Sequence, residues 1–404
     1  MSNWIHSTLE QICVPDKGAI ISGPFGSNIS SKFFVSQGVP VIRGNNLTLG
    51  KEKFIDNGFA YITPEKAEEL NCYALKNDLV FTAAGTLGQV GVLTGDLRYE
   101  KYVISNKQLR ACIDSSKVDL LYAYYWYSSP WMQQYFITNN KGSTVPLVTL
   151  SELKSAPITY PESIEEQRKI ASIFDDITTK IDLNAQLCAE LEAMAKTLYD
   201  YWFVQFDFPD ENGKPYRTSG GAMEWCQELG REVPKGGKAK RVSELTKVIT
   251  GKEDANFSTA DGEYKFFTCG QETLCCDTPA FTGKAVLIAG NGDFNVKHYT
   301  GSFNAYQRTY VLIPNEDKYY TAMFIAAKDT IQSFRQGSNG SIVKFITKGD
   351  VENITLLSPT NDDLLQRLNG IIEQIELFEK ENDELIKLRD WLLPMLMNGQ
   401  AFIH

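Results

Sequence analysis

The chain has 404 residues, 43% of them hydrophobic and 22% charged, and its formal net charge is −10. These values exclude wholesale disorder, and the length predicts two to four domains. The charge excludes a surface that is basic throughout, but it leaves room for a local basic groove, because the charges that line a cleft determine its field.

The N-terminal region, residues 1–160, is rich in short β-branched or aromatic runs that Gly, Asn and Asp interrupt, which predicts a β-rich domain. Shorter helices are expected within it at 64–70 and 119–136. The first residues, Met1–His6, lack the basic and apolar segments of a secretory signal. No apolar run reaches about 18 residues, so we expect no membrane-spanning helix and a cytoplasmic protein.

A long helix is predicted next, within a segment at 161–204. Ser163 and Glu166 have the spacing of a capping box, in which each side chain satisfies a free amide at the start of the helix. Apolar residues then recur at heptad spacing, which is typical of a coiled coil. The first row is Ile170, Ile177, Asn184, Leu191 and Leu198, and the predicted second row is Ile173, Lys180, Leu187 and Met194.

The second half of the chain follows the same order. Residues 205–240 are predicted to be a linker that ends in the basic, flexible run Lys235–Arg241. Residues 241–358 form a second β-rich domain, with a helix at 319–335. A second long helix, about 361–397 within the segment 359–404, starts at a weaker capping signal, Thr360–Asp363, and Pro394 predicts a kink or an early stop. Its heptad rows are Leu368, Ile375 and Asn382, and Ile371, Phe378, Leu385 and Leu392.

An internal repeat relates the two halves. Residues 142–149 match residues 340–347, and Asn184 and Asn382 share the same offset of 198 positions. We therefore expect an α+β fold in which two β-rich domains are separated by two long antiparallel coiled-coil helices about a pseudo-two-fold axis. Asn184 and Asn382 would then fix the register of the helix pair. The alternative is that each helix only covers its own β-rich domain.

Several common reactive motifs are absent. Gly251-Lys252 and Gly283-Lys284 lack the spacing of a phosphate-binding loop, and Gly290-Asn291-Gly292 lacks the third glycine of a dinucleotide site. The cysteines between 269 and 276 fit no zinc spacing, and the eight cysteines form no Cys-x-x-Cys pair. We expect reduced structural thiols, no catalytic residue, no metal site and no cofactor bound by the chain itself.

Several segments, among them Pro161–Ala171 and Leu198–Phe203, resemble type I restriction–modification specificity subunits. Pro161–Ala171 is similar to the start of that family's spacer helix, and Leu198–Phe203 with Phe206–Pro209 to its end. Four further segments resemble motifs of its target-recognition domains: Ile21–Ser27, Ile42–Asn46, Ala83–Gly88 and Gly142–Thr149. The second copy departs from the pattern at its start, where no Gly-Pro-Phe-Gly loop is found, and its spacer lacks Glu-Gln.

The resemblance implies a function. Such a subunit reads a bipartite, asymmetric sequence on double-stranded DNA, one domain for each half-site, and has no catalytic activity of its own. Its spacer helices dock two modification subunits, which methylate adenine at N6 with S-adenosylmethionine. Restriction subunits, which use ATP and Mg²⁺, join them to cut unmethylated DNA. The implied host is bacterial or archaeal.

DNA readout needs exposed donors and acceptors: Arg for guanine, Asn or Gln for adenine, and Lys, Arg or backbone amides for phosphate. The candidates in the first half are Arg43, Asn45, Asn46, Asn106, Lys107, Gln108 and Arg110. Those in the second half are Asn291, Lys297, His298, Gln307, Arg308 and Lys344. Gln108 and Gln307 are expected at similar places in the two copies, and Gly26–Asn28 and Gly142-Ser143 are expected to offer amides to phosphate. Each of these polar residues also fits an ordinary solvated turn.

Two other classes of function stay open at this stage. An enzyme with its own methyltransferase or nuclease activity is disfavoured by the missing motifs. A coiled-coil scaffold with no role on nucleic acid is mildly favoured by the net charge, but the paired polar β-rich domains argue against it.

Overall fold

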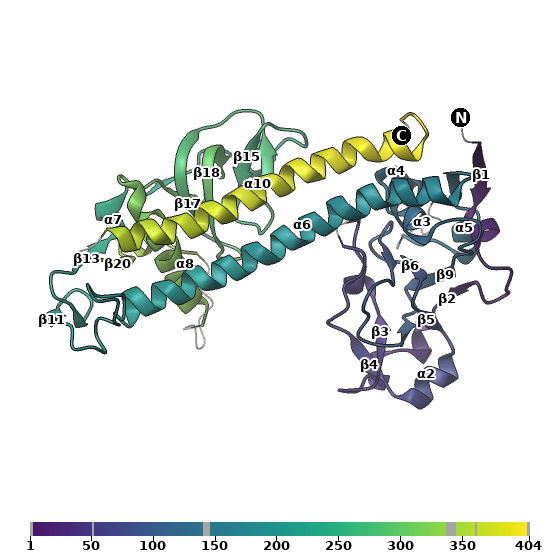
Figure 1. The fold of residues 1–404 in the computed structure, drawn as a ribbon, viewed down its shortest axis with the longest axis horizontal. Helices are drawn as coiled ribbons and strands as arrows, with labels where there is room; N and C mark the ends of the chain where they lie inside the picture. The colour runs from purple at the N-terminus through teal and green to yellow at the C-terminus, as the bar shows by residue number, and fades with distance from the viewer. Residues whose placement is uncertain (1–2, 51, 140–145, 337–344, 360–361, 402–404) are drawn as a thin grey trace. The chain divides into compact units, whose positions relative to one another are not determined.

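The computed structural model describes residues 3–50, 52–139, 146–336, 345–359 and 362–401 (Figure 1). Its contacts divide the chain into two compact units. The first unit is Met1–Leu183 with Asn382–His404, and the second unit is Asn184–Glu381. Each long helix therefore contributes residues to both units.

The first unit contains two four-stranded sheets, in the strand orders β2-β9-β6-β7 and β4-β3-β8-β5, and one strand pair, β1-β10. Its strands are β1 (Trp4–Thr8), β2 (Ile20–Ser22), β3 (Val39–Ile42), β4 (Ala60–Ile62), β5 (Tyr73–Leu75), β6 (Asp78–Thr82), β7 (Val90–Val92), β8 (Lys101–Ile104), β9 (Gln108–Cys112) and β10 (Pro157–Pro161). Its short helices are α1 (Leu9–Ile12), α2 (Pro64–Leu70), α3 (Leu120–Tyr127), α4 (Pro130–Thr138) and α5 (Leu150–Lys154), with the 3-10 turns η1 (Gly26–Asn28), η2 (Ser31–Phe33) and η3 (Gly44–Asn46).

The second unit contains one six-stranded sheet, β14-β19-β17-β18-β15-β16, and the strand pairs β11-β12 and β13-β20. Its strands are β11 (Met223–Cys226), β12 (Arg231–Pro234), β13 (Lys238–Arg241), β14 (Ile249–Thr250), β15 (Tyr264–Phe267), β16 (Leu274–Cys276), β17 (Phe281–Ala289), β18 (Val296–Ala305), β19 (Thr309–Leu312) and β20 (Thr355–Ser358). Its helices are the π-helical turn η4 (Asp200–Val204), α7 (Val242–Leu245), η5 (Ala255–Phe257), η6 (Asp317–Tyr319), α8 (Tyr320–Gln336) and α9 (Lys348–Glu352).

The two long helices are α6 (Ile164–Tyr199) and α10 (Asp363–Met397). The α+β prediction is confirmed, and the helix predicted at 64–70 has those bounds. The helix predicted over 119–136 is instead two helices, because Ser129 caps a new helix that begins at Pro130. Pro394 lies inside α10, which continues for three residues beyond it.

The predicted linker, 205–240, is partly regular structure. It contains β11 and β12, and its basic end is strand β13, which pairs antiparallel with β20. The expectation that Lys235–Arg241 is a flexible run is therefore wrong for residues 238–241. In the first unit, β1 pairs with β10 in the same way, so each unit closes with a strand pair formed by the two ends of its β-rich segment.

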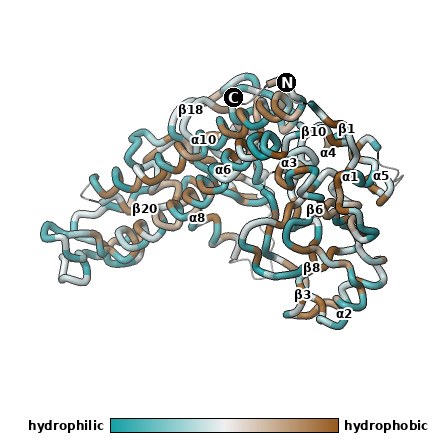
Figure 2. Tube along the Cα trace, turned by 45° about the vertical axis from the view of Figure 1, so that its right-hand side comes forward, coloured by the Kyte–Doolittle hydropathy of each residue, from teal (hydrophilic) through white to brown (hydrophobic). Residues whose placement is uncertain are grey.

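The long helices contact each other in an antiparallel manner within each unit. In the second unit the Asn184 amide donates to Glu381 Oε2 (2.7 Å), and Cys188 contacts the Ile375 carbonyl. In the first unit the Asn382 amide donates to the Ile181 carbonyl (3.2 Å). The predicted pairing of the helices is thus observed, and Asn184 is completely buried. Figure 2 shows apolar and polar residues alternating along both helices.

The second heptad row predicted on α6 is wrong by one position. Leu187 and Met194 are 42% and 45% exposed. The row that faces inward with Ile170, Ile177 and Asn184 consists instead of Phe174, Ile181, Cys188 and Ala195. The Ser163 hydroxyl accepts a hydrogen bond from the Glu166 amide, as the predicted capping box requires. Residues 360 and 361 of the second capping signal lie outside the described residues.

Candidate nucleic-acid interface

One turn recurs in both units, between β8 and β9 in the first and between β18 and β19 in the second. Backbone hydrogen bonds establish the correspondence. The Ala83 amide donates to the Lys107 carbonyl (2.7 Å), and the Gly290 amide donates to the Arg308 carbonyl (2.9 Å). Lys107 therefore corresponds to Arg308, and Asn106 to Gln307.

This turn presents an exposed amide followed by an exposed cation in both units. Asn106 and Lys107 are exposed, and so are Gln307 and Arg308. An amide side chain offers a donor and an acceptor, which adenine matches, while Arg matches the two acceptors of guanine and Lys binds phosphate or guanine. The four residues were all candidates from the sequence, and the structure brings each pair to an equivalent place.

The expected match between Gln108 and Gln307 is wrong by two positions. Gln108 corresponds to Thr309, since their carbonyls accept from the equivalent amides of Gly23 (2.9 Å) and Gly251 (3.1 Å). Both Gln108 and Thr309 are about 1% exposed. Gln108 contacts the Ser105 hydroxyl inside the unit and does not lie on an exposed loop.

A close backbone crossing supports the turn in each unit. A Cβ atom on Gly23 would lie 1.8 Å from the Ser105 carbonyl oxygen, and one on Gly251 would lie 1.9 Å from that of Ala305. Only glycine fits such a crossing. The second copy therefore keeps the start of the motif as Thr250-Gly251, although its sequence shows no Gly-Pro-Phe-Gly loop.

The second unit has a cavity of about 540 Å³ beside its turn, within the range of about 300–1,000 Å³ that ligand sites occupy. Gln307, Arg308 and Asn291 line it together. Phe345, also in its lining, is 64% exposed and offers a flat aromatic face. Three sequence candidates thus meet at one site, and Phe345 is a residue that the sequence analysis did not select.

The first unit places the 3-10 turn η1 beside its turn between β8 and β9. A Cβ atom on Gly26 would lie 3.0 Å from the Asn106 amide nitrogen, and Phe25, directly before η1, is 86% exposed. Residues Gly26–Asn28 are exposed as predicted. The other proposed amide site, Gly142-Ser143, and the candidate Lys344 lie outside the described residues.

The candidates on the loop after β3 have mixed positions. Asn45 is exposed and donates to the Gly58 carbonyl (3.3 Å), and Arg43 donates to the same carbonyl (3.4 Å). Asn46 is completely buried and donates to the carbonyls of Ile55 and Asn57. The expectation that Asn46 lies on an exposed surface is therefore wrong, because its amide holds the loop closed.

Arg110 lies on β9 within an internal ion pair. Its Nε lies 3.6 Å from Asp78 Oδ2, and both side chains are largely shielded from solvent. Burial raises the pKa of Asp78, although the Leu75 amide and the Arg110 charge oppose that rise. The Arg110 side chain is therefore engaged inside the unit, which does not fit the expected exposed contact.

Lys297 and His298 lie on β18, not on a loop. Lys297 Nζ donates to the carbonyls of Gly270 (2.9 Å) and Glu272 (3.3 Å), and burial lowers its pKa. The side chain of His298 is only 6% exposed, and its Nδ1 lies 3.3 Å from Glu376 Oε1 on α10. The structure does not offer His298 for contact with DNA.

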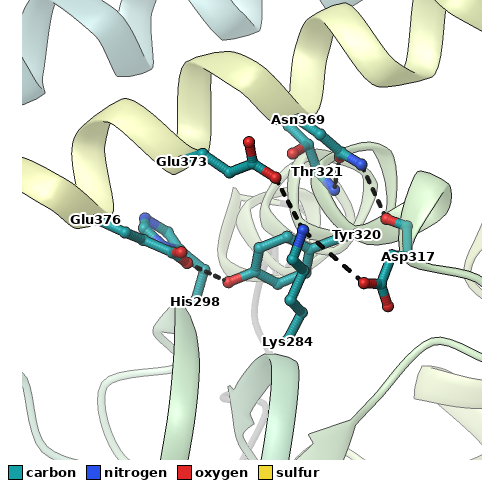
Figure 3. Close-up of polar contacts among 8 residues, drawn as sticks. All are labelled: Lys284, His298, Asp317, Tyr320, Thr321, Asn369, Glu373 and Glu376. Atoms are coloured by element: carbon teal, nitrogen blue, oxygen red, sulfur yellow. Dashed lines mark hydrogen bonds and ion pairs between the residues drawn. The ribbon is translucent and has the colours of Figure 1, made fainter.

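His298 belongs to a polar cluster that joins the sheet of the second unit to α10 (Figure 3). Tyr320 donates to Glu376 Oε1 (2.6 Å), and Lys284 Nζ lies 2.8 Å from Glu373 Oε1. Burial acts to raise the pKa of Glu376, but the hydrogen bonds and charge around it outweigh that effect, and its pKa is lowered. This cluster fixes α10 against the β-rich segment that carries the turn between β18 and β19.

The described residues contain no cluster of three or more His, Cys, Asp or Glu arranged to hold a metal ion. All eight cysteines are free thiols. None of the helices in the described part is both long and apolar enough to cross a membrane.

Comparisons with known proteins agree on one family. Residues 1–193 match the family model described as type I restriction modification DNA specificity domain. The type I restriction enzyme EcoDI specificity subunit of Escherichia coli is 36% identical over 176 residues, which are 42% of this chain and 39% of that subunit's length. The MjaIX specificity subunit of Methanocaldococcus jannaschii is 24% identical over 97% of this chain and 93% of its own length.

The fold of the chain is also seen in a solved structure. A type I restriction–modification S subunit from M. genitalium superimposes with a TM-score of 0.58 at 16% identity, and the match covers 98% of this chain and 96% of that one. The sequence match and the fold match together cover both halves of the chain. Residues 1–193 therefore match a type I restriction–modification DNA specificity domain, and nearly the whole chain is similar to type I specificity subunits.

Proposed function

We propose that this chain reads a bipartite, asymmetric target on double-stranded DNA, with one part read by each unit. The observation that carries the proposal is the recurrence of one turn, which carries Asn106-Lys107 in one unit and Gln307-Arg308 in the other. Equivalent scaffolds that carry different side chains at the same exposed place suit two readers of different sequences. That is the requirement for an asymmetric target.

We further propose that the long helices dock two modification subunits. The proposal is supported by large apolar side chains that each unit leaves exposed on α6 or α10, where a partner could cover them. In the first unit they are Leu183, Ile386, Leu388 and Trp391, and in the second unit Leu187, Met194 and Leu377. Those partners would supply adenine-N6 methylation and bind S-adenosylmethionine. Restriction subunits would bind ATP and Mg²⁺.

In this proposal the chain itself is not an enzyme and binds no cofactor. Its contribution is to choose the sequence and to set the gap between the two parts of the target. The complex would act in the cytoplasm on resident and incoming DNA.

The test is a genome-wide map of N6-methyladenine in cells that express the modification subunit with or without this chain. We expect a bipartite methylated motif only when the chain is present. Lys107→Ala should weaken or relax one part of the motif and Arg308→Ala the other. Lys76→Ala and Arg217→Ala remove exposed cations of the same units away from the turns, and both should leave the motif intact. A map that does not depend on this chain would refute the proposal and favour a scaffold.

A further inference from the structure

The amide of Gln307 is held in one orientation by a carboxylate. Gln307 Nε2 donates to Asp254 Oδ1 (2.7 Å), and the Gln307 backbone amide donates to the Glu253 carbonyl (2.9 Å). Asp254 directly precedes η5 and is itself exposed. Main chain and side chain of Gln307 are therefore both tied to the segment that follows Gly251.

This contact fixes the orientation of the Gln307 amide, because it determines which side of the group carries the NH₂. An ionised carboxylate only accepts hydrogen bonds, so it selects the NH₂ group and turns the carbonyl oxygen away from itself. One N–H of Gln307 is used, and the second N–H and both lone pairs of Oε1 stay available. Gln307 thus presents one donor and one acceptor in a defined order, on the rim of the 540 Å³ cavity.

Adenine matches that order. In the major groove adenine offers an acceptor at N7 and a donor at N6, whereas guanine offers two acceptors, N7 and O6. Opposite guanine, the fixed Oε1 of Gln307 would face O6, and two acceptors without a proton between them repel each other. An amide free to turn over would lose part of this discrimination, since it could present its two groups in either order.

We propose that Gln307 reads an adenine in the part of the target bound by the second unit, and that Asp254 is the positioning residue that orients it. This inference rests on the proposed function and adds a base and a mechanism to it. The first unit differs at the equivalent place, because Phe25 precedes η1 where Asp254 precedes η5. The phenyl ring cannot orient Asn106, so the two units should differ in how sharply this position is read.

The experiment uses the purified complex of this chain with its modification subunit. The probe is a DNA duplex library in which the part of the motif assigned to the second unit is randomised, and methylated molecules are sequenced. The wild-type complex should favour adenine at one position by about 10-fold or more, since a good bidentate contact discriminates by about 5- to 160-fold. Gln307→Ala should reduce that preference to about twofold or less.

Asp254→Ala should reduce the adenine preference at that same position by about 3- to 10-fold and leave every other position unchanged. Asp254→Asn keeps an accepting oxygen but adds an N–H donor that can pair with the turned-over Gln307 amide, so it should also relax the adenine preference, by less than Asp254→Ala does. Asp261→Ala removes another exposed carboxylate of the second unit and should change nothing. A general structural defect would lower methylation at all sequences alike and would not relax one position.

Three results would overturn the inference. They are an adenine preference that survives Asp254→Ala, a relaxation at a different position from that of Gln307→Ala, and a base other than adenine at the position that Gln307 controls. The second result would mean that Asp254 contacts a base directly. A wild-type complex that selects no sequence would instead overturn the proposed function, and this inference with it.

Discussion

Tyr320→Phe should destabilise the second unit, because it removes one hydrogen bond to a charged group. The side chain of Tyr320 is completely buried, and its hydroxyl donates to Glu376 Oε1 at 2.6 Å. A hydrogen bond to a charged group contributes about 1.5–3 kcal/mol, so we expect a loss of about 2 kcal/mol. For a unit of roughly 200 residues, this lowers the melting temperature by about 4–8 °C.

The effect should depend on pH in a definite direction. The lowered pKa of Glu376 adds stability above the ordinary carboxyl pKa, and this stability is lost as the pH falls through the lowered value. Without the Tyr320 hydroxyl, the pKa of Glu376 rises toward its ordinary range. The difference in the free energy of unfolding between variant and wild type should therefore be largest near pH 7. It should shrink in acid, where the carboxyl is protonated in both proteins.

Scanning calorimetry at several pH values measures both effects, and a double-mutant cycle with Glu376→Gln isolates the contact. We expect a coupling energy of about 1–2 kcal/mol. Tyr216→Phe is the matched control, because its exposed hydroxyl donates to a neutral carbonyl, that of Ala222 (2.9 Å). If Tyr320→Phe melts like the wild type, or if Tyr216→Phe costs as much, the cluster does not hold α10 in the way we describe.

Three further outcomes are expected. Asn184→Asp would place a second carboxylate against Glu381 in a buried position. In urea unfolding, it should lower the free energy of unfolding by about 2 kcal/mol or more at pH 7, and this loss should be recovered below about pH 5. Gly251→Ala should abolish soluble expression, because its Cβ would lie 1.9 Å from a backbone oxygen. The Cβ of Gly370→Ala, on α10, would meet no atom within 4 Å, so this variant should raise the free energy of unfolding by about 1 kcal/mol. Burial raises the pKa of Cys13 to about 12. Mass spectrometry should therefore find this thiol unmodified by iodoacetamide in the native protein at pH 8 and modified in urea. Modification in the native protein would contradict its burial.

The fold was readable from the sequence where one pattern dominated. The repeat and the heptad spacing predicted two β-rich units and an antiparallel helix pair. The second heptad row failed because α6 carries apolar residues on three adjacent rows, and spacing alone does not show whether Leu187 or Cys188 faces inward. Strand β13 was missed because its partner, β20, lies more than 100 residues later in the chain.

The candidate site was predicted less well, because polar residue type does not reveal burial. Asn46 and His298 look like surface contacts in the sequence, yet one closes a loop and the other contacts α10. The pairing of Asn106 with Gln307 needed the strand register, since the offset between the copies drifts upstream of the helices. Asp254 carried no signal at all until the fold placed it beside Gln307.

The strand pairs that close the two units have an evolutionary consequence. Since β1 pairs with β10, and β13 with β20, the two ends of each β-rich segment lie next to each other. A recombination event that replaces everything between such a pair needs to match only two neighbouring strands at its junctions. Under the proposed function, one genetic exchange would then replace the reader of one part of the target and keep the long helices that we propose as docking surfaces.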